Sequence, residues 1–242
     1  MISIHNLHKS FGEKKVLDGV NLDIETGETL VIIGQSGCGK SVLLKHIVGL
    51  LDPDEGDVIV DEHAVNEMKE KDLYELRKRF GYLFQGAALF DSMTVAENVS
   101  LGLVENGIHT EAQLVKIVAE KLSLVGLEGI EQLKPAELSG GMKKRVGLAR
   151  ALATNPDYIF YDEPTTGLDP IMSDQIDSLI ADLTKKLKVT SVVVTHDLFS
   201  VSTIAHRVAM MHQGKIHFEG TPDELRTSSD PIVQDFIERY MH

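Results

Sequence analysis

The sequence is poor in cysteine and in basic residues, and it has no long apolar run. Its 242 residues include one cysteine, Cys38, which excludes an intrachain disulfide framework and fits a reducing compartment. The longest apolar runs, such as 30–33 and 192–194, are far shorter than the roughly 18 residues that a membrane-spanning helix needs. The chain also opens without a charged-then-apolar leader. We therefore expect a soluble cytosolic protein that reaches a membrane only by docking onto it.

Acidic residues outnumber basic ones, 37 against 24, which gives a formal net charge of −13 at pH 7. Proteins that bind nucleic acid broadly usually carry a basic stripe, whereas this chain has one short basic run at 143–145. We therefore expect no nucleic-acid partner. The length and the 43% content of hydrophobic residues suit one α/β unit with a modest insertion.

Apolar patterning predicts a sheet with helices between its strands. Continuous apolar runs at 29–33, 158–161 and 191–195 are typical of strands buried on both faces. Alternation near the N-terminus, within 2–24, predicts half-buried strands, and helical spacing at 176–183 predicts a helix between two of the buried strands. Strands that alternate with helices in this way favour a mostly parallel, doubly wound α/β sheet.

The middle of the chain has helical spacing and no strand signal. Thr110 can cap one helix there, and a second helix would begin after Ser139. Further on, a capping box at 221–224 and the pair Asp230-Pro231 each predict the start of a short helix. The expected division is an α/β core at 1–85 and 154–220, an inserted helical subdomain at 86–153, and a C-terminal helical extension at 221–242.

A phosphate-loop pattern follows the first buried strand. The segment Gly34-Gln-Ser-Gly-Cys-Gly-Lys40-Ser41 lies between that strand and a helix, where backbone N–H groups can cradle phosphates at the helix N-terminus. Lys40 would lie along the β- and γ-phosphates, and the Ser41 hydroxyl would bind Mg²⁺. This pattern predicts a nucleoside-triphosphate site.

Polar residues follow the two later buried strands. Asp162 and Glu163 come at the end of one strand, where α/β sheets bind their ligands. Asp162 suits outer-sphere binding of Mg²⁺, and Glu163 suits activation of the attacking water, although a solvated acidic turn is the alternative for this segment alone. His196 follows the other strand and could donate a hydrogen bond to a γ-phosphate oxygen.

The segment Leu138-Ser139-Gly140-Gly141-Met142 predicts a second anion site. Ser-Gly-Gly alone is a flexible turn, but here it begins a helix whose exposed amides and positive dipole end favour an anion. One chain cannot easily bind the same nucleotide with both anion sites, because the sites lie on different subdomains. A dimer can do so if the second site of one chain closes over the γ-phosphate bound by its partner.

Several motifs follow one another along the chain, namely the phosphate loop, Gln85, 138–142, Asp162-Glu163, Gly167-Leu-Asp169-Pro170 and His196. With these motifs in the family's order, nearly the whole chain resembles the ATP-binding subunit of an ABC transporter. The resemblance implies a P-loop NTPase fold with a mostly parallel sheet core, an N-terminal antiparallel β subdomain and an inserted helical subdomain. It also implies a head-to-tail homodimer that sandwiches two ATP molecules with Mg²⁺ and is joined to integral-membrane permease subunits.

The resemblance assigns a role to individual positions. Phe11 would stack on adenine beside Val16, and Gln85 would sense Mg²⁺ and the attacking water while linking to the membrane subunit. The expected catalytic residues are Glu163, His196, Gln85 and Lys40, and the expected metal-binding residues are Ser41, Gln85 and Asp162. The expected nucleotide-binding residues are Phe11, Val16, Gly34, Gln35, Ser36, Gly37, Cys38, Gly39, Lys40, Ser41, Val42, Ser139, Gly140, Gly141 and Asp169, the last four from the partner's side of the dimer interface.

Three positions depart from the commonest family pattern, namely Phe11 for tyrosine, Val42 for threonine and Met142 for glutamine. None of them removes a phosphate, metal or base group, so we expect activity. The segments 85–98 and 138–145 resemble the ATPase subunit of the Mla phospholipid-transport system, a branch that works with MCE-type lipid-binding proteins and an accessory subunit. This resemblance implies a place on the cytoplasmic face of a bacterial inner membrane.

Other interpretations remain open at this point. The same family includes ATPase subunits of small-solute importers, such as those for amino acids, and soluble ABC ATPases that act on nucleic acid. A non-hydrolysing ATP switch is a third class, which an intact Glu163 and His196 disfavour. The last helix, near 232–240, could pack on a neighbouring ATPase subunit or on its own domain.

Overall fold

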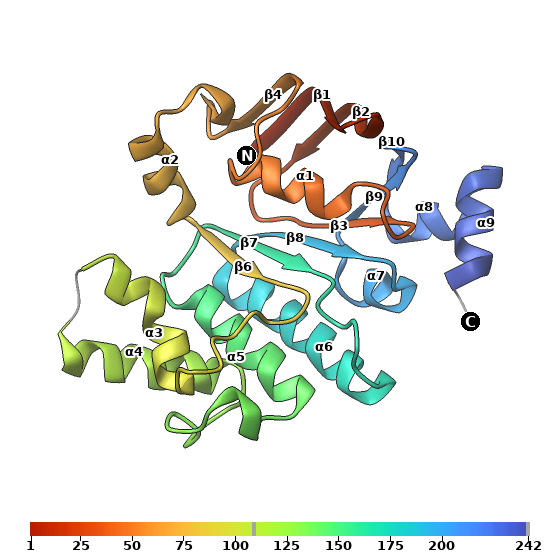
Figure 1. The fold of residues 1–242 in the computed structure, drawn as a ribbon. Helices are drawn as coiled ribbons and strands as arrows, with labels where there is room; N and C mark the ends of the chain where they lie inside the picture. Colours follow the sequence, from red (N-terminus) through yellow and green to blue (C-terminus); the bar gives the residue numbers. More distant parts are fainter. Residues whose placement is uncertain (108–109, 241–242) are drawn as a thin grey trace. The chain divides into compact units, whose positions relative to one another are not determined.

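The computed structural model describes residues 1–107 and 110–240 of the chain (Figure 1). Contacts divide the chain into two compact units, which we call unit 1 (Met1–Arg77 with Val189–His242) and unit 2 (Lys78–Lys188). The expected fold class, α/β with an antiparallel N-terminal sheet and mostly parallel pairing elsewhere, is confirmed. The proposed division into core, helical subdomain and C-terminal extension stays a prediction.

The N-terminal sheet of unit 1 is antiparallel. Its strands, in spatial order, are β2 Lys14–Ile24, β1 Ile2–Phe11, β4 Glu55–Val60 and β5 His63–Ala64. Ile2 and Ile4 of β1 pair with Ile24 and Leu22 of β2, and all four side chains are buried. The alternating pattern in the sequence therefore places one face of this sheet in the core, as predicted.

A second group of strands in unit 1 is mostly parallel. Its members, in spatial order, are β10 Lys215–Gly220, β9 Arg207–His212, β3 Thr29–Gly34 and β8 Thr190–Thr195. Every residue of β3 and β8 is buried, which explains their continuous apolar sequences. Because β3 and β8 run parallel and Ile33 pairs with Thr195, the segments that follow these two strands leave the sheet at the same edge.

Short helices complete unit 1. They are α1 Lys40–Ile47, the 3₁₀ turn η1 Val65–Glu67, α2 Glu70–Arg77, α7 Leu198–Ile204, α8 Pro222–Thr227 and α9 Pro231–Tyr240. The capping box expected for α8 is present, since the Thr221 hydroxyl accepts the N–H of Glu224 and the Glu224 carboxylate accepts the N–H of Thr221. In this single chain α9 packs on its own unit, where the Tyr240 ring lies 5.8 Å from the ring of His196. Packing of α9 on a neighbouring subunit stays a prediction.

Unit 2 combines two parallel strands with helices. The strands are β6 Phe80–Leu83 and β7 Tyr158–Asp162, and the helices are α3 Val95–Glu105, α4 Glu111–Leu124, the 3₁₀ turn η2 Pro135–Glu137, α5 Gly140–Leu152 and α6 Pro170–Leu187. Among the described residues of 86–153 every regular element is a helix, as the spacing of apolar residues predicts. Thr110 caps α4 with a full capping box, which confirms the expected start of that helix.

Helix α5 lies unusually close to β6 because two glycines face each other's elements. A Cβ on Gly81 of β6 would stand 2.4 Å from the carbonyl oxygen of Ala151 in α5. A Cβ on Gly147 of α5 would stand 2.9 Å from Leu83 of β6 and 3.2 Å from Ala87. This contact fixes α5 against the segment that follows β6. None of the helices in the described part of the chain has both the length and the apolarity of a transmembrane span.

Candidate active site

The predicted phosphate loop joins β3 to α1 in unit 1. Gly39 has a φ of +111°, and a Cβ there would stand 2.8 Å from the carbonyl oxygen of Val16, so only glycine fits without strain. The Lys40 ammonium, which is buried, donates hydrogen bonds to the carbonyl oxygens of Gly34 at 2.7 Å and Gln35 at 3.3 Å. The strand–loop–helix context required by the phosphate-loop pattern is therefore present, and Val16 lies directly against the loop.

His196 emerges beside the phosphate loop, since it follows β8 just as the loop follows the adjacent parallel strand β3. The turn after it is held by Asp197, whose backbone N–H donates to the Thr195 hydroxyl at 3.0 Å and whose carboxylate caps α7. The structure thus brings Lys40 and His196 to one edge of the sheet in unit 1, as expected.

Phe11 offers an exposed aromatic ring on the N-terminal hairpin of unit 1. It ends β1 and pairs with Lys14 of β2, so it belongs to the same hairpin as Val16. About half of its surface is exposed (49%), and the Lys9 ammonium lies 5.9 Å from the ring centroid. An exposed aromatic ring of this kind can stack on a nucleobase.

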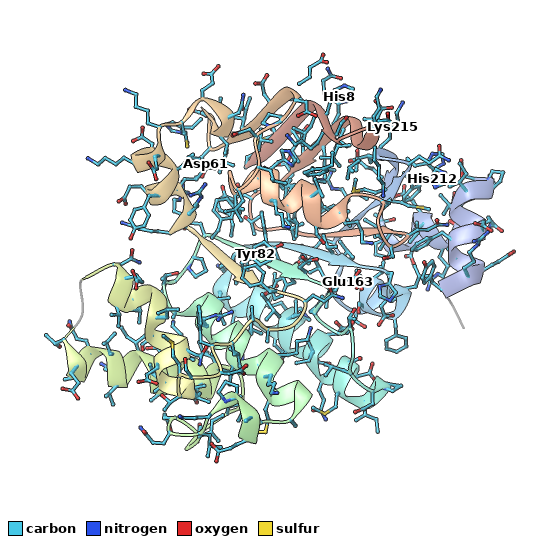
Figure 2. The ribbon with its side chains drawn as sticks, viewed as in Figure 1. His8, Asp61, Tyr82, Glu163, His212 and Lys215 are labelled. Carbon is cyan, nitrogen blue, oxygen red and sulfur yellow. The ribbon has the colours of Figure 1, made fainter. Side chains whose placement is uncertain are left out.

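Gln85, Asp162 and Glu163 come together at the ends of β6 and β7 in unit 2. These strands are parallel and Leu83 pairs with Tyr161, so the residues that follow them share one edge. The Tyr82 hydroxyl donates to the Asp162 carboxylate at 3.3 Å. Burial, together with the Asp162 charge, raises the pKa of the Tyr82 phenol, so it remains a donor at neutral pH. Figure 2 shows Tyr82 on β6 and Glu163 directly after β7.

Glu163 has a strained backbone that neighbouring groups hold in place. Its φ of +50° lies in the left-handed region, which non-glycine residues seldom adopt. The Thr166 hydroxyl donates to its carboxylate at 3.0 Å, and the Lys144 ammonium donates to its backbone carbonyl at 3.1 Å. Lys144 also donates to the backbone carbonyl of Gln85. A single buried cation therefore joins the two residues expected to act on the attacking water.

Sequence reasoning overlooked Lys144 and Tyr82. In the sequence Lys144 is one member of the short basic run at 143–145, but in the structure it is 5% exposed. Burial lowers the pKa of its ammonium, and the charges of Glu163 and Asp162 act in the opposite direction. The signal that could have identified it is its spacing, because Leu148 and Ala151, four and seven positions later on the same helix, are both buried.

The segment predicted as a second anion site begins α5, as expected. The Ser139 hydroxyl accepts the N–H of Met142 at 3.3 Å and caps the helix, and Ser139 and Gly140 are exposed. Asp169 caps α6 in the same way through the N–H of Met172 at 3.0 Å. A Cβ on Gly141 would meet the end of the Met172 side chain at 2.0 Å, so the starts of α5 and α6 lie together in unit 2.

The expected site residues are thus distributed over both units. Unit 1 holds Phe11, Val16, the phosphate loop 34–42 and His196, whereas unit 2 holds Gln85, 139–141, Asp162, Glu163 and Asp169. Phe11 and Val16 lie on the antiparallel hairpin of β1 and β2, and the other members lie at the ends of adjacent parallel strands or at the starts of contacting helices. Their individual roles stay predictions.

Comparison with known proteins identifies relatives over nearly the full chain. A family model described as ABC transporter matches residues 17–166. The chain is 42% identical over 236 residues to a probable ribonucleotide transport ATP-binding protein of Mycobacterium leprae, covering 98% of this chain and 68% of that protein. It is 41% identical over 238 residues to the intermembrane phospholipid transport ATP-binding protein MlaF of Haemophilus influenzae, covering 98% and 90%. It is also 43% identical over 225 residues to the methionine import ATP-binding protein MetN of Clostridioides difficile, covering 93% and 70%.

A solved structure agrees with these relatives. A dimeric ATP-binding cassette in a post-hydrolysis state, bound to ADP and phosphate, matches with a TM-score of 0.84 and 35% identity, covering 92% of this chain and 99% of that one. The family match, the relatives matched over nearly the whole of this chain and the shared fold all agree with the order of motifs in the sequence. The chain therefore belongs to the ABC transporter family and is an ATP-binding, ATP-hydrolysing subunit of that family.

Proposed function

We propose that this subunit energises phospholipid trafficking between the inner and outer membranes of a bacterium. The observation that carries this proposal is the similarity to an intermembrane phospholipid transport subunit, which spans 98% of this chain and 90% of that relative. The segments 85–98 and 138–145, which resemble the Mla branch, support the same choice. In this proposal the subunit sits on the cytoplasmic face of the inner membrane, held there by a permease.

Amino-acid import is the second candidate. It is favoured by the methionine import relative, which is 43% identical to this chain, so overall identity does not separate the two cargoes. The match spans 70% of that relative, compared with 90% of the phospholipid one. We therefore rank phospholipid first.

In the proposed reaction, Glu163 polarises a water molecule for in-line attack on the γ-phosphorus. Lys40 and His196 then donate hydrogen bonds to the oxygens on which charge develops, which stabilises the transition state more than the bound ATP. Gln85 orients the water from the end of β6, beside Glu163. Phe11 and Val16 hold the adenine, which positions the phosphates without taking part in the chemistry.

Magnesium is the metal that this donor set suits. Ser41, Gln85 and Asp162 offer hydroxyl, amide and carboxylate oxygens, and the Asp162 carboxylate is already oriented by the Tyr82 hydroxyl. When bound, Mg²⁺ would neutralise phosphate charge and fix the geometry of the triphosphate. In the proposal, Ser41 and Gln85 would contribute oxygens to the metal, and Asp162 would bind it in the outer sphere.

The proposed assembly is a head-to-tail homodimer. The dimeric cassette solved with ADP and phosphate supports it, as does the exposed start of α5 at Ser139 and Gly140. In the dimer, Ser139 and Gly141 of one chain contact the γ-phosphate held by the other, and Asp169 lies at the interface. Permease subunits, an MCE-type lipid-binding protein and an accessory subunit complete the proposed transporter.

Mass spectrometry of the complex distinguishes the two cargoes. The tagged full chain would be solubilised gently from its native membrane, and both the protein partners and the bound lipids would be identified. A multispan permease with an MCE-type protein and phospholipid is expected. A permease with a small-solute-binding protein and no enriched phospholipid would overturn the lipid assignment while leaving the ATPase intact. A Lys40→Ala sample carried through the same purification controls for lipid that adheres without a functional ATPase.

A further inference from the structure

Lys144 is a buried cation whose partners are backbone carbonyls. It lies on α5, the helix that begins with the Ser-Gly-Gly segment, and its ammonium donates to the carbonyl oxygens of Gln85 and, at 3.1 Å, Glu163. An ammonium has three N–H donors and is expensive to bury unless they are satisfied. The position of this charge therefore depends on the two segments that it joins.

The segment after β6 is strained, and α5 holds it with a second cation. Ala87 and Ala88 have φ values of +59° and +47°, in the region that disfavours a Cβ. The Arg150 guanidinium donates to both of their carbonyl oxygens at 2.7 Å. Strained conformations of this kind cost about 1–3 kcal/mol each and persist only where the surroundings fix them. Helix α5 supplies those surroundings.

Arg150 donates to the segment after β6, whereas Lys144 donates to that segment at Gln85 and also to the strained residue Glu163 after β7. Glu163, with a φ of +50°, follows β7, whereas Gln85 follows β6. Thr166 contacts the Glu163 carboxylate, but Lys144 contacts its backbone and thereby links it to Gln85. The Lys144 ammonium joins α5, the segment that follows β6 and the proposed catalytic base within unit 2.

We propose that Lys144 is a positioning residue for ATP hydrolysis, which holds the backbones of Gln85 and Glu163 in the relative arrangement that the attack on the γ-phosphorus requires. The proposal rests on the proposed role of Glu163 as the base. Both hydrogen bonds of the Lys144 ammonium lie within unit 2, whereas the phosphate loop and Phe11 belong to unit 1. The loss of Lys144 should therefore affect turnover rather than nucleotide affinity.

The size of the effect follows from the geometry. A misplacement of about 1 Å in a reacting group can cost about 100-fold in rate. We expect Lys144→Met, which keeps the length and removes the donors, to lower kcat by about 10- to 100-fold and to leave the KM for ATP within about threefold of the wild-type value.

Lys121 provides a matched control. It is also a lysine of unit 2 with 5% exposure, and its ammonium donates to the Asn155 side chain at 2.7 Å and to Glu120 at 3.1 Å. Lys121→Met removes a buried ammonium without touching Gln85 or Glu163. It should lower the thermal stability by an amount comparable to Lys144→Met while keeping kcat within about threefold of wild type.

The experiment measures kcat and KM for ATP by phosphate release in the full chain, copurified with its native membrane partners. The series contains wild type, Lys144→Met, Lys121→Met and Glu163→Gln. A loss of kcat in Lys144→Met, with KM retained and Lys121→Met active, is the expected result. If Lys144→Met does not accumulate as folded protein, Lys144→Leu, which is neutral and also lacks the donors, is held to the same criterion.

Two results would overturn the inference, and they are distinguishable. If Glu163→Gln abolishes turnover but Lys144→Met keeps wild-type kcat, or loses only as much as Lys121→Met does, then Lys144 has no positioning role. If Glu163→Gln keeps wild-type turnover, the proposed base is wrong, and the inference that depends on it fails with it.

Discussion

The close contact between β6 and α5 makes a prediction whose size can be estimated from the structure. The perturbation is Gly81→Ala, which adds one methyl group to β6. Its Cβ would stand 2.4 Å from the carbonyl oxygen of Ala151 and 3.1 Å from the ring of Pro156. A comfortable separation of non-bonded heavy atoms is about 3.5 Å, so the overlap with the oxygen is about 1 Å. That oxygen belongs to the backbone of α5 and cannot rotate away, so the helix and strand must move apart.

Two opposing terms determine the expected loss of stability. Overpacking of this kind costs about 1–3 kcal/mol. Replacing a strand glycine by alanine returns about 0.5–1 kcal/mol, because the unfolded chain loses less freedom on folding. Because the clash is with a backbone oxygen at 2.4 Å, the overpacking lies in the upper part of its range, about 2–3 kcal/mol. The net decrease in the free energy of unfolding is therefore about 1–2.5 kcal/mol, which corresponds to a Tm lower by about 2–10 °C for a chain of this size.

Thermal unfolding followed by circular dichroism measures this decrease, with Gly102→Ala as the control. Gly102 lies inside α3, and a Cβ there would meet only Thr154, at 3.6 Å, among atoms within 4 Å. Alanine should raise the stability at that position by about 0.5–1 kcal/mol, since it is the better helix former. A Gly81→Ala variant as stable as wild type, or stabilised like the control, would refute the proposed contact between β6 and α5.

Three further substitutions test separate features. Gly39→Ala should weaken ATP binding at least tenfold in a titration with labelled nucleotide, because its Cβ would press within 2.8 Å of the Val16 carbonyl; unchanged affinity would contradict this. Thr94→Ala removes the capping box of α3 and should lower the free energy of unfolding by about 1 kcal/mol in urea, against no change if the cap is unimportant. The hydrogen bond from His217, followed by backbone N–H groups of α9, lowers the pKa of Asp230, so its charge stabilises the fold at pH 5, and this contribution should shrink as the pH falls below about 4 toward the lowered pKa. The advantage of wild type over Asp230→Asn should therefore be smaller at pH 3 than at pH 5, and a constant difference would contradict the assignment.

Much of the fold could be predicted because its strongest local signals agree with the tertiary structure. The strands β3 and β8 are covered on both faces, and so their sequences are continuous apolar runs. Thr110 and Thr221 each begin a helix, where a hydroxyl satisfies free backbone N–H groups. The family could also be predicted, because several motifs occur in the family's order and the phosphate loop lies between a buried strand and a helix, where it can bind phosphate.

Other elements carry weak or misleading local signals. Helix α2 is mostly charged and buries one residue, Leu76, so its sequence has no apolar stripe that would predict a helix. Helix α3 starts at a capping box, Thr94-Val-Ala-Glu97, but no helix that starts there is predicted from the sequence. Strand β10 alternates between exposed and half-buried positions and pairs with β9. Neither of these two strands is predicted from the sequence.

The site was predictable in its motifs but not in the contacts that hold them. No sequence rule places alanines such as Ala87 and Ala88 in the left-handed region, because their conformation is imposed by Arg150 from α5. The inward turn of Lys144 depends on which face of α5 meets β6. The conformation of these alanines and the burial of Lys144 both result from tertiary packing, which a local sequence pattern does not predict.

The most direct test of the account is the turnover of Glu163→Gln, measured by phosphate release and by the size of the ATP-bound species in solution. Glutamine keeps the shape of the side chain and the hydrogen bond from Thr166 but cannot take a proton from water. We predict that turnover is lost while ATP still binds, and that ATP now stabilises the dimer. Near-normal turnover in this variant would contradict the assignment of Glu163 as the base.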